Sequence, residues 1–157
     1  MGYCGDTVLV GSHDHALDAK NRLTVPARFR DALSRGAVIS RGLEKCLEVH
    51  PVDRWEQHVE EQIPAGPKSR EARELQRFLL HRAEFAELDA AGRLTLTPRL
   101  IDHAAITKEC VVVGMRTHLE VWDRETWERH DEEVGAQAED LANAVAAITT
   151  PRNGHQS

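Results

Sequence analysis

The 157-residue sequence predicts an α+β fold that is rich in β-structure and built from two copies of one small unit. The chain repeats itself, each copy alternates short apolar strands with turns and short helices, and 41 % of the residues are apolar, enough for a modest core. Two copies are too few for a solenoid, so we expect a pseudo-two-fold axis to relate them.

The repeat is visible in two aligned blocks. Residues 17–33 (LDAKNRLTVPARFRDAL) match residues 88–104 (LDAAGRLTLTPRLIDHA) at an offset of 71, with 8 of 17 positions identical. Residues 42–61 then match residues 114–133 at an offset of 72, with 9 of 20 identical, including a Leu-Glu-Val tripeptide and a tryptophan. Neither copy is large enough to bury a sizeable core by itself, so the two copies must interlock.

Each copy opens with a β-rich stretch that runs into the pentapeptide Asp-Ala-x-(Asn/Gly)-Arg. The Asp carboxylate can accept backbone N–H groups, and Asn or Gly tolerates a left-handed backbone, so this pentapeptide predicts a tight turn. The turn-structuring residues are Asp18, Asn21, Asp89 and Gly92. The following Arg-Leu-Thr-(Val/Leu) predicts a strand with Leu23 and Val25 on one face.

A short helix comes next, with Thr97 and Pro98 as its N-cap and first residue in the second copy. An apolar strand, a glycine, the Leu-Glu-Val strand and a helix that carries Trp55 or Trp127 complete the copy. We expect both tryptophans to lie in the core or in a subunit interface. Between the copies, residues 69–83 have the periodicity of an amphipathic helix. The predicted organisation is a first unit over 11–53, connecting helices over 54–82, a second unit over 83–126, C-terminal helices over 127–148 and a disordered tail over 149–157.

The net charge of −6 is unevenly distributed. Residues 17–41 carry six basic residues against two acidic ones, a net +4, whereas residues 125–157 carry seven acidic residues against two basic ones, a net −5. This balance excludes a polycationic coat over the whole protein but allows a local basic patch.

The repeated arginine at the exit of each turn is the candidate binding feature. An arginine on a rigid turn can contact phosphate or a guanine edge, and β-structure can present it to a DNA groove. The candidate DNA-binding residues are Lys20, Arg22, Arg28, Arg93 and Arg99. Ala91 leaves Arg93 without a lysine neighbour, so we expect Arg22 to contribute more. The alternative is that each arginine only pairs with the Asp of its own turn, which stabilises a hairpin by about 0–1 kcal/mol.

The two motifs, Asp-x-Lys-x-Arg-Leu-Thr-Val-Pro and Leu-Asp-x-x-Gly-Arg-Leu-Thr-Leu, resemble the MraZ family of transcriptional regulators. The half-unit is similar to the AbrB-type swapped-hairpin DNA-binding domain, and the match covers residue 11 to about residue 134. Asn21 stands where the family usually has Gly; since Asn reaches the left-handed region at modest cost, we expect the turn to survive.

The resemblance implies two tandem AbrB-like swapped-hairpin units that form a double-psi-like barrel with flanking helices. It also implies a cytoplasmic, nucleoid-associated repressor of the division and cell-wall gene cluster, with no catalytic activity, cofactor or small-molecule substrate. The implied partners are double-stranded promoter DNA with G-rich repeats and further copies of the chain in a ring, whose multiple contacts would compensate for the few cations of one protomer.

Two other function classes stay open. His13 and His15 lie on one face of a strand and could form part of a metallohydrolase site, although no HExxH motif supplies further ligands. An antitoxin-like protein-interaction module on the same fold is the second alternative. Three scattered cysteines indicate neither a disulfide framework nor a zinc pair, and we expect them to be buried or inert. With no apolar run of about 18 residues and no export signal, we expect a soluble cytosolic protein.

Overall fold

The computed structural model describes residues 8–149. Its strands are β1 (Ser12–Ala16), β2 (Arg22–Thr24), β3 (Ala37–Arg41), β4 (Leu47–Pro51), β5 (Glu84–Ala86), β6 (Arg93–Thr95), β7 (Glu109–Gly114) and β8 (Leu119–Asp123). Its α-helices are α1 (Ala27–Arg30), α2 (Trp55–Gln62), α3 (Arg70–Leu80), α4 (Pro98–Ala104), α5 (Arg124–Ala136) and α6 (Ala138–Thr149), with 3-10 turns η1 (Asp31–Leu33) and η2 (Val52–Arg54). Cys4 and the tail residues 150–157 lie outside the described residues.

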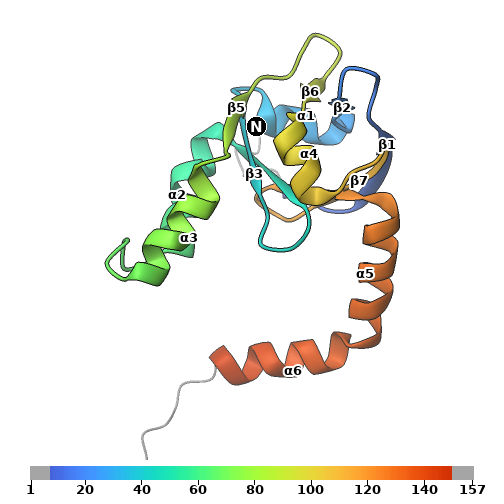
Figure 1. Cartoon of the computed structure of the whole chain (residues 1–157). Helices are drawn as coiled ribbons and strands as arrows, with labels where there is room; N and C mark the ends of the chain where they lie inside the picture. The colour runs from blue at the N-terminus through green and yellow to red at the C-terminus, as the bar shows by residue number, and fades with distance from the viewer. Residues whose placement is uncertain (1–7, 150–157) are drawn as a thin grey trace, which may run out of the picture. The chain divides into compact units, whose positions relative to one another are not determined.

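Six strands form one antiparallel sheet in the order β1-β7-β8-β4-β3-β5. The repeat makes β1 to β4 equivalent to β5 to β8, so exchanging the two copies reverses this order and reproduces it. The first strand of each copy pairs with the third strand of the other copy: β1 with β7 and β5 with β3. The predicted pseudo-two-fold relation and the interlocking of the copies are therefore confirmed (Figure 1).

The remaining two strands, β2 and β6, pair with each other as a short antiparallel ribbon. Leu23 lies opposite Leu94 in this ribbon, and Glu48 lies opposite Glu120 in the β4–β8 pair. Both are repeat-equivalent pairs, so the pseudo-two-fold axis passes between their members. The α+β class and the tandem units agree with the prediction. Over residues 8–149 the hydrogen-bonded strands form two sets, the ribbon and the six-stranded sheet, and the side chains of both sets pack into one core.

One hydrophobic core is shared by the two copies. Its side chains come from repeat-equivalent positions of both, for example Leu23 with Leu94 and Leu33 with Ala104. Phe29 of α1 and Leu100 of α4, also repeat-equivalent, are each 1 % exposed. A core assembled in this way requires both copies at once, since neither encloses enough apolar surface alone.

Local signals explain where α3 and α4 begin. Ser69 is the N-cap of α3, where its Oγ accepts a hydrogen bond from Ala72 N at 3.1 Å, in agreement with the predicted helix. Thr97 is the N-cap of α4 and Pro98 its first residue, as predicted, although the Thr97 hydroxyl makes no capping hydrogen bond. In the first copy the helix starts one residue later than this pattern suggests, because Pro26 is itself the N-cap of α1.

Residues 1–124 and 125–157 form two compact units. In the described part of the second unit, α5 and α6 expose most of their side chains, and the acidic residues of α5 are solvated as expected. In the first unit Trp55 is buried, which agrees with its predicted place in the core. Among the described residues no helix has both the length and the apolar content of a membrane span.

Candidate nucleic-acid interface

The first turn is held by a single aspartate. Asp18 Oδ1 accepts backbone N–H groups from Lys20 and Arg22, both at 2.9 Å, and Asn21 N donates to the Asp18 carbonyl at 3.0 Å. Asn21 has a φ of 58°, the left-handed conformation predicted from its side chain. The turn-structuring roles assigned to Asp18 and Asn21 are thus visible in its hydrogen bonds and backbone.

The second turn repeats this arrangement at equivalent positions. Asp89 Oδ1 accepts from Ala91 N at 3.0 Å and from Arg93 N at 2.9 Å, and Gly92 has a φ of 76°. The same local sequence pattern therefore produces the same turn geometry twice, with an arginine at the end of each turn.

Each turn arginine also pairs with its own aspartate. Arg22 Nε donates to Asp18 Oδ2 at 2.6 Å, and Arg93 Nε donates to Asp89 Oδ2 at 2.8 Å. The backbone N–H of each arginine is the largest cause of a lowered pKa for both aspartates, with the arginine side chain adding to it, so the carboxylates stay charged. The hairpin-stabilising pair considered above is therefore present in both turns.

The ion pair with aspartate orients each arginine mainly through its Nε atom. Within residues 8–149 Arg22 contacts Asp18 only through Nε, which leaves its two terminal nitrogens for a ligand. Arg93 behaves in the same way, except that its Nη1 also lies 3.8 Å from Asp18 Oδ2 across the two turns. A held guanidinium loses less side-chain entropy when it binds a ligand.

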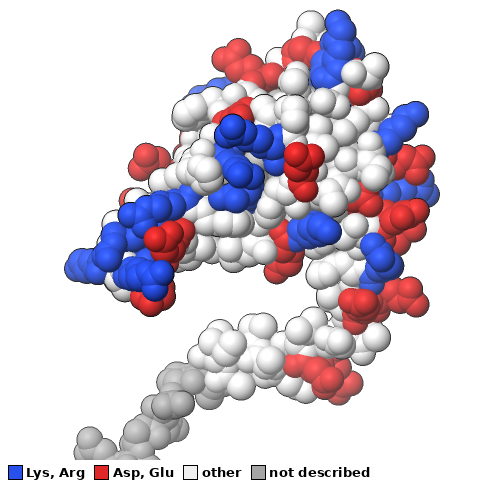
Figure 2. All heavy atoms as spheres, viewed as in Figure 1, with Lys and Arg blue, Asp and Glu red and all other residues white. Residues whose placement is uncertain are grey.

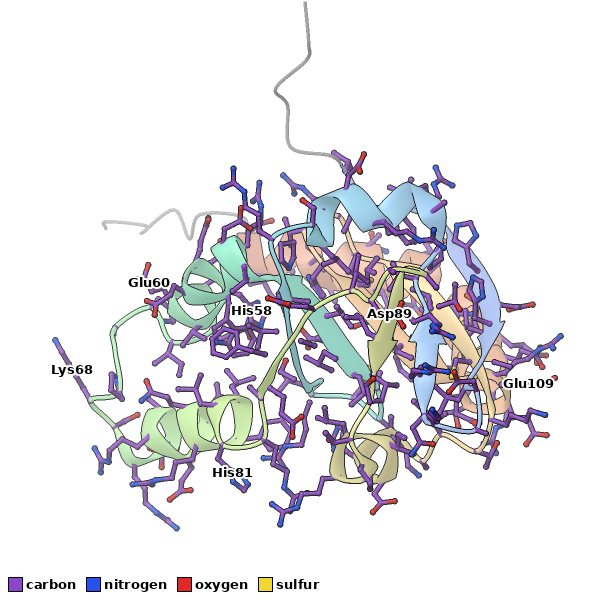
Figure 3. All side chains as sticks on the ribbon, turned by 90° about the horizontal axis from the view of Figure 1, so that it is seen from above. His58, Glu60, Lys68, His81, Asp89 and Glu109 are labelled. Atoms are coloured by element: carbon purple, nitrogen blue, oxygen red, sulfur yellow. The ribbon has the colours of Figure 1, made fainter. Side chains whose placement is uncertain are left out.

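The two turns are also tied to each other. Val25 N donates to the Gly92 carbonyl at 2.9 Å, and Leu96 N donates to the Asn21 carbonyl at 2.8 Å. Together with the β2–β6 ribbon, these bonds place both turns at one end of the first unit, where Figure 1 shows the two loops emerging together. Figure 3 looks onto this end and labels Asp89 of the second turn.

Arg30 is a site residue that the sequence analysis missed. Its side chain, which belongs to the first copy, lies so close to Gly92 of the second turn that a β-carbon there would clash with the guanidinium. Arg30 Nε also donates to the Val25 carbonyl at 2.9 Å. The second turn therefore also has a second basic side chain near its arginine. The absence of a lysine at position 91 is then no reason to expect Arg93 to contribute less to DNA binding than Arg22. The repeat alignment hid Arg30, since its equivalent is Ile101.

The other candidate residues are spread more widely. Lys20 is exposed in the first turn beside Arg22. Arg28 is exposed on α1, but its guanidinium lies beside Gly11, which precedes β1 and so is at the opposite end of that strand from the turn. Arg99 is exposed on α4, at the equivalent position of the second copy. The structure thus brings together Lys20, Arg22, Arg30 and Arg93 and leaves Arg28 at a distance from them.

Charge is mixed at the turns and concentrated elsewhere. Four basic residues and two acidic ones, Asp18 and Asp89, lie at the turns, and Figure 2 shows blue and red atoms side by side at that end. A second basic surface, which the sequence analysis did not single out, covers residues 68–82 on and around α3. It carries Lys68, Arg70, Arg73, Arg77 and Arg82 against Glu71 and Glu74. This second basic surface offers a control against which DNA binding by the turns can be measured.

The alternative site at His13 and His15 does not gather further ligands. Both side chains are half-buried on the same face of β1, as predicted, and the His13 ring packs edge-on against Phe29 with centroids 5.4 Å apart. Among residues 8–149 no third ligating side chain joins them within metal-binding distance. Of the cysteines, Cys46 and Cys110 are buried and free, and burial raises the pKa of the Cys110 thiol to about 12.

A protein-family model matches the chain twice. The family model described as "MraZ protein, putative antitoxin-like" matches residues 8–78 and again residues 79–150. The boundary between the matches falls near the end of α3, between the two copies identified from the repeat. The two matches together include every described strand and both arginine turns.

Proposed function

Because the chain belongs to the MraZ family, a family of regulators, we propose that it is a sequence-specific DNA-binding transcriptional regulator that contacts the duplex with its two turns. The observation that carries this proposal is the pair of rigid, symmetry-related turns that hold Arg22 and Arg93 by Nε. The DNA-binding units are residues 11–53 and 83–126, and the protein has no catalytic role of its own.

The geometry supports two kinds of DNA contact, one to base edges and one to phosphates. Arg22 and Arg93 are held through Nε, and among the described residues only the Nη1 atom of Arg93 also lies near a carboxylate, 3.8 Å from Asp18 Oδ2. A guanidinium can donate two hydrogen bonds to the O6 and N7 atoms of guanine. Lys20 and Arg30 flank them on the two turns and contribute phosphate contacts, which position the protein without reading sequence. Arg28 and Arg99 are further phosphate contacts, made where the duplex extends beyond the turns.

One protomer offers few cations, so we propose that binding depends on a ring of several copies. Copies held in one ring engage successive G-rich repeats about one helical turn apart, and the effective concentration multiplies their individual affinities. In the second unit, α6 exposes three apolar side chains at helical spacing: Leu141, Val145 and Ile148, exposed by 44 %, 60 % and 83 %. We assign this stripe to contacts with another copy, since exposed contiguous apolar surface marks interaction sites.

Membership of the family supports a biological assignment. The proposed role is repression of the division and cell-wall gene cluster by a cytoplasmic, nucleoid-associated protein. The direct experiment is a gel-shift assay on the DNA upstream of the protein's own gene, with one repeat scrambled at a time. The proposal predicts a stepwise loss of affinity as repeats are removed. Equal binding to intact and fully scrambled fragments would overturn it.

A further inference from the structure

A cluster of three imidazoles surrounds one buried carboxylate, remote in sequence from the turns. Glu48 Oε1 lies 3.0 Å from His50 Nε2, 3.4 Å from His118 Nε2 and 3.6 Å from His58 Nε2. The side chain of Glu48 is 11 % exposed, and that of His50 is 2 % exposed. Glu48 and His50 come from β4, His58 from α2, where Figure 3 labels it, and His118 from the turn between β7 and β8.

The second copy shows how many hydrogen-bond donors accompany a glutamate buried at the equivalent position. Glu120, the equivalent of Glu48, accepts one hydrogen bond at 3.0 Å from the indole Nε1 of Trp122, the equivalent of His50. The position equivalent to His118 is Cys46, whose thiol pKa is raised, chiefly by burial, so it stays protonated. The Cys46 thiol also hydrogen-bonds to Glu120, so two donors accompany the carboxylate in the second copy. In the first copy three imidazoles surround Glu48, one more than that pair of donors.

We propose that Glu48, His50 and His118 bind a divalent transition-metal ion. Their ligand atoms all lie within 4.8 Å of one another. With metal–ligand bonds of about 2.0–2.2 Å, the edge of a tetrahedral zinc site is roughly 3.3 Å long. The distances from Glu48 Oε1 to His50 Nε2 and His118 Nε2, 3.0 Å and 3.4 Å, are close to that value. Imidazole and carboxylate ligands suit Zn²⁺ and its neighbours in the first transition row.

The electrostatic state of the cluster matches this assignment. Burial lowers the pKa of both His50 and His118 to about 4, so their rings are neutral at pH 7, and the neutral ring is the form that ligates a metal. Burial raises the pKa of Glu48, whereas His118 and His58 act in the opposite direction. A bound cation would stabilise the charged carboxylate further. The Nε2 atom of His58 has no hydrogen-bond partner among the described residues, although it is buried.

A small open pocket borders the cluster. It has a volume of about 30 Å³ and is lined by His50, Arg54, Gln57, His58, Glu61 and Thr117. An ion at the cluster would join β4 of the first copy to the β7–β8 turn of the second. The proposed metal is therefore structural and bridges the two copies at the pseudo-two-fold axis.

The test uses full-length protein without a histidine tag, stripped of metal by a chelator and titrated with Zn²⁺ against a chromophoric competitor. We expect one equivalent to bind, and visible ligand-field bands to appear with Co²⁺. His118→Ala should lower the Zn²⁺ affinity at least about tenfold. His81→Ala, which removes an exposed imidazole at the C-cap of α3, is the matched control and should bind as the wild-type chain does.

Glu48→Gln serves as a second variant, because it keeps the shape of the side chain while removing its charge. Circular dichroism shows whether each variant is folded before it is titrated. Loss of the bound equivalent in both folded variants, with retention in His81→Ala, supports the site. The proposal is overturned if the wild-type chain binds no Zn²⁺, or if His118→Ala and Glu48→Gln bind it as tightly as the wild-type chain. A loss seen only with His13→Ala would place the ion at β1 instead, and would equally overturn it.

Discussion

The guanidinium of Arg30 lies across the backbone of Gly92, so the first copy of the repeat covers the arginine turn of the second. Gly92 is buried by this contact, whereas the equivalent Asn21 is exposed in the first turn. The contact explains why glycine occupies one turn and asparagine the other. Asn21 only has to adopt a positive φ, but position 92 must adopt a positive φ and also leave room for Arg30.

Gly92→Ala should therefore destabilise the protein. The new methyl group clashes with Arg30, and an alanine in the left-handed region costs about 1–2 kcal/mol. We expect the free energy of unfolding to fall by about 2 kcal/mol or more, measured by urea denaturation. Asn21→Gly is the matched control and should change stability by no more than about 0.5 kcal/mol. Equal effects of the two substitutions would show that Arg30 does not pack on Gly92.

The turn aspartates give the protein a specific dependence on acid. Asp18 and Asp89 have pKa values below the ordinary 3.8 in the folded chain, because they accept hydrogen bonds from backbone and side-chain N–H groups. Their contribution to stability is present above about pH 4 and is lost as the pH falls through the folded pKa values. The wild-type chain should thus be more stable than the double variant Asp18→Asn/Asp89→Asn at pH 7.

That difference in the free energy of unfolding should shrink as the pH is lowered below about 4. Denaturation curves at a series of pH values between 7 and about 2.5 measure it. A difference that stays constant over this range would mean that the carboxylates do not hold the turns through their charge.

Local sequence signals predicted the turns well. The side chain of Asp18, the positive φ of Asn21 and the arginine at the exit all depend on residues within a span of five, where backbone chemistry alone decides the conformation. The amphipathic helix after Ser69 was likewise predictable, because its cap and its apolar face are both local. The repeat predicted the pseudo-two-fold relation because equivalent sequences adopt equivalent folds.

Contacts between the copies could not be predicted in the same way. The pairing of β1 with β7 depends on which copy offers a free strand edge, and no local pattern in β1 encodes that choice. Arg30 and His118 were missed because each differs from its repeat equivalent, Ile101 and Cys46. The alignment identifies residues that are identical in both copies, whereas Arg30 and His118 occupy positions at which the two copies differ.

The apolar stripe on α6 predicts the assembly state. Replacing Val145 and Ile148 together by Asn removes apolar surface without changing the charge, so contacts between copies should weaken. Light scattering coupled to size exclusion should then show a smaller particle than that of the wild-type chain. Ala147→Asn, on a different face of the same helix, is the control and should leave the particle size unchanged. An unchanged particle in the double variant would remove α6 from the interface.

Arg22 and Arg93 should contribute comparably to DNA binding, since each has a second cation on its turn, Lys20 in one case and Arg30 in the other. Arg22→Ala and Arg93→Ala are expected to weaken binding by similar factors in a fluorescence anisotropy titration with a promoter fragment. A much smaller effect for Arg93→Ala would indicate that only the first turn reaches the duplex.

The central claim is that the turns, and not the basic surface on α3, bind DNA. A salt titration of promoter binding compares two double variants that each lose two positive charges, Arg22→Ala/Arg93→Ala and Arg70→Ala/Arg73→Ala. We expect the turn variant to lose more than tenfold in affinity and to show a shallower dependence on salt, while the α3 variant stays close to the wild-type chain. Similar behaviour of the two variants, or a larger loss in the α3 variant, would show that the turns are not the DNA-binding surface.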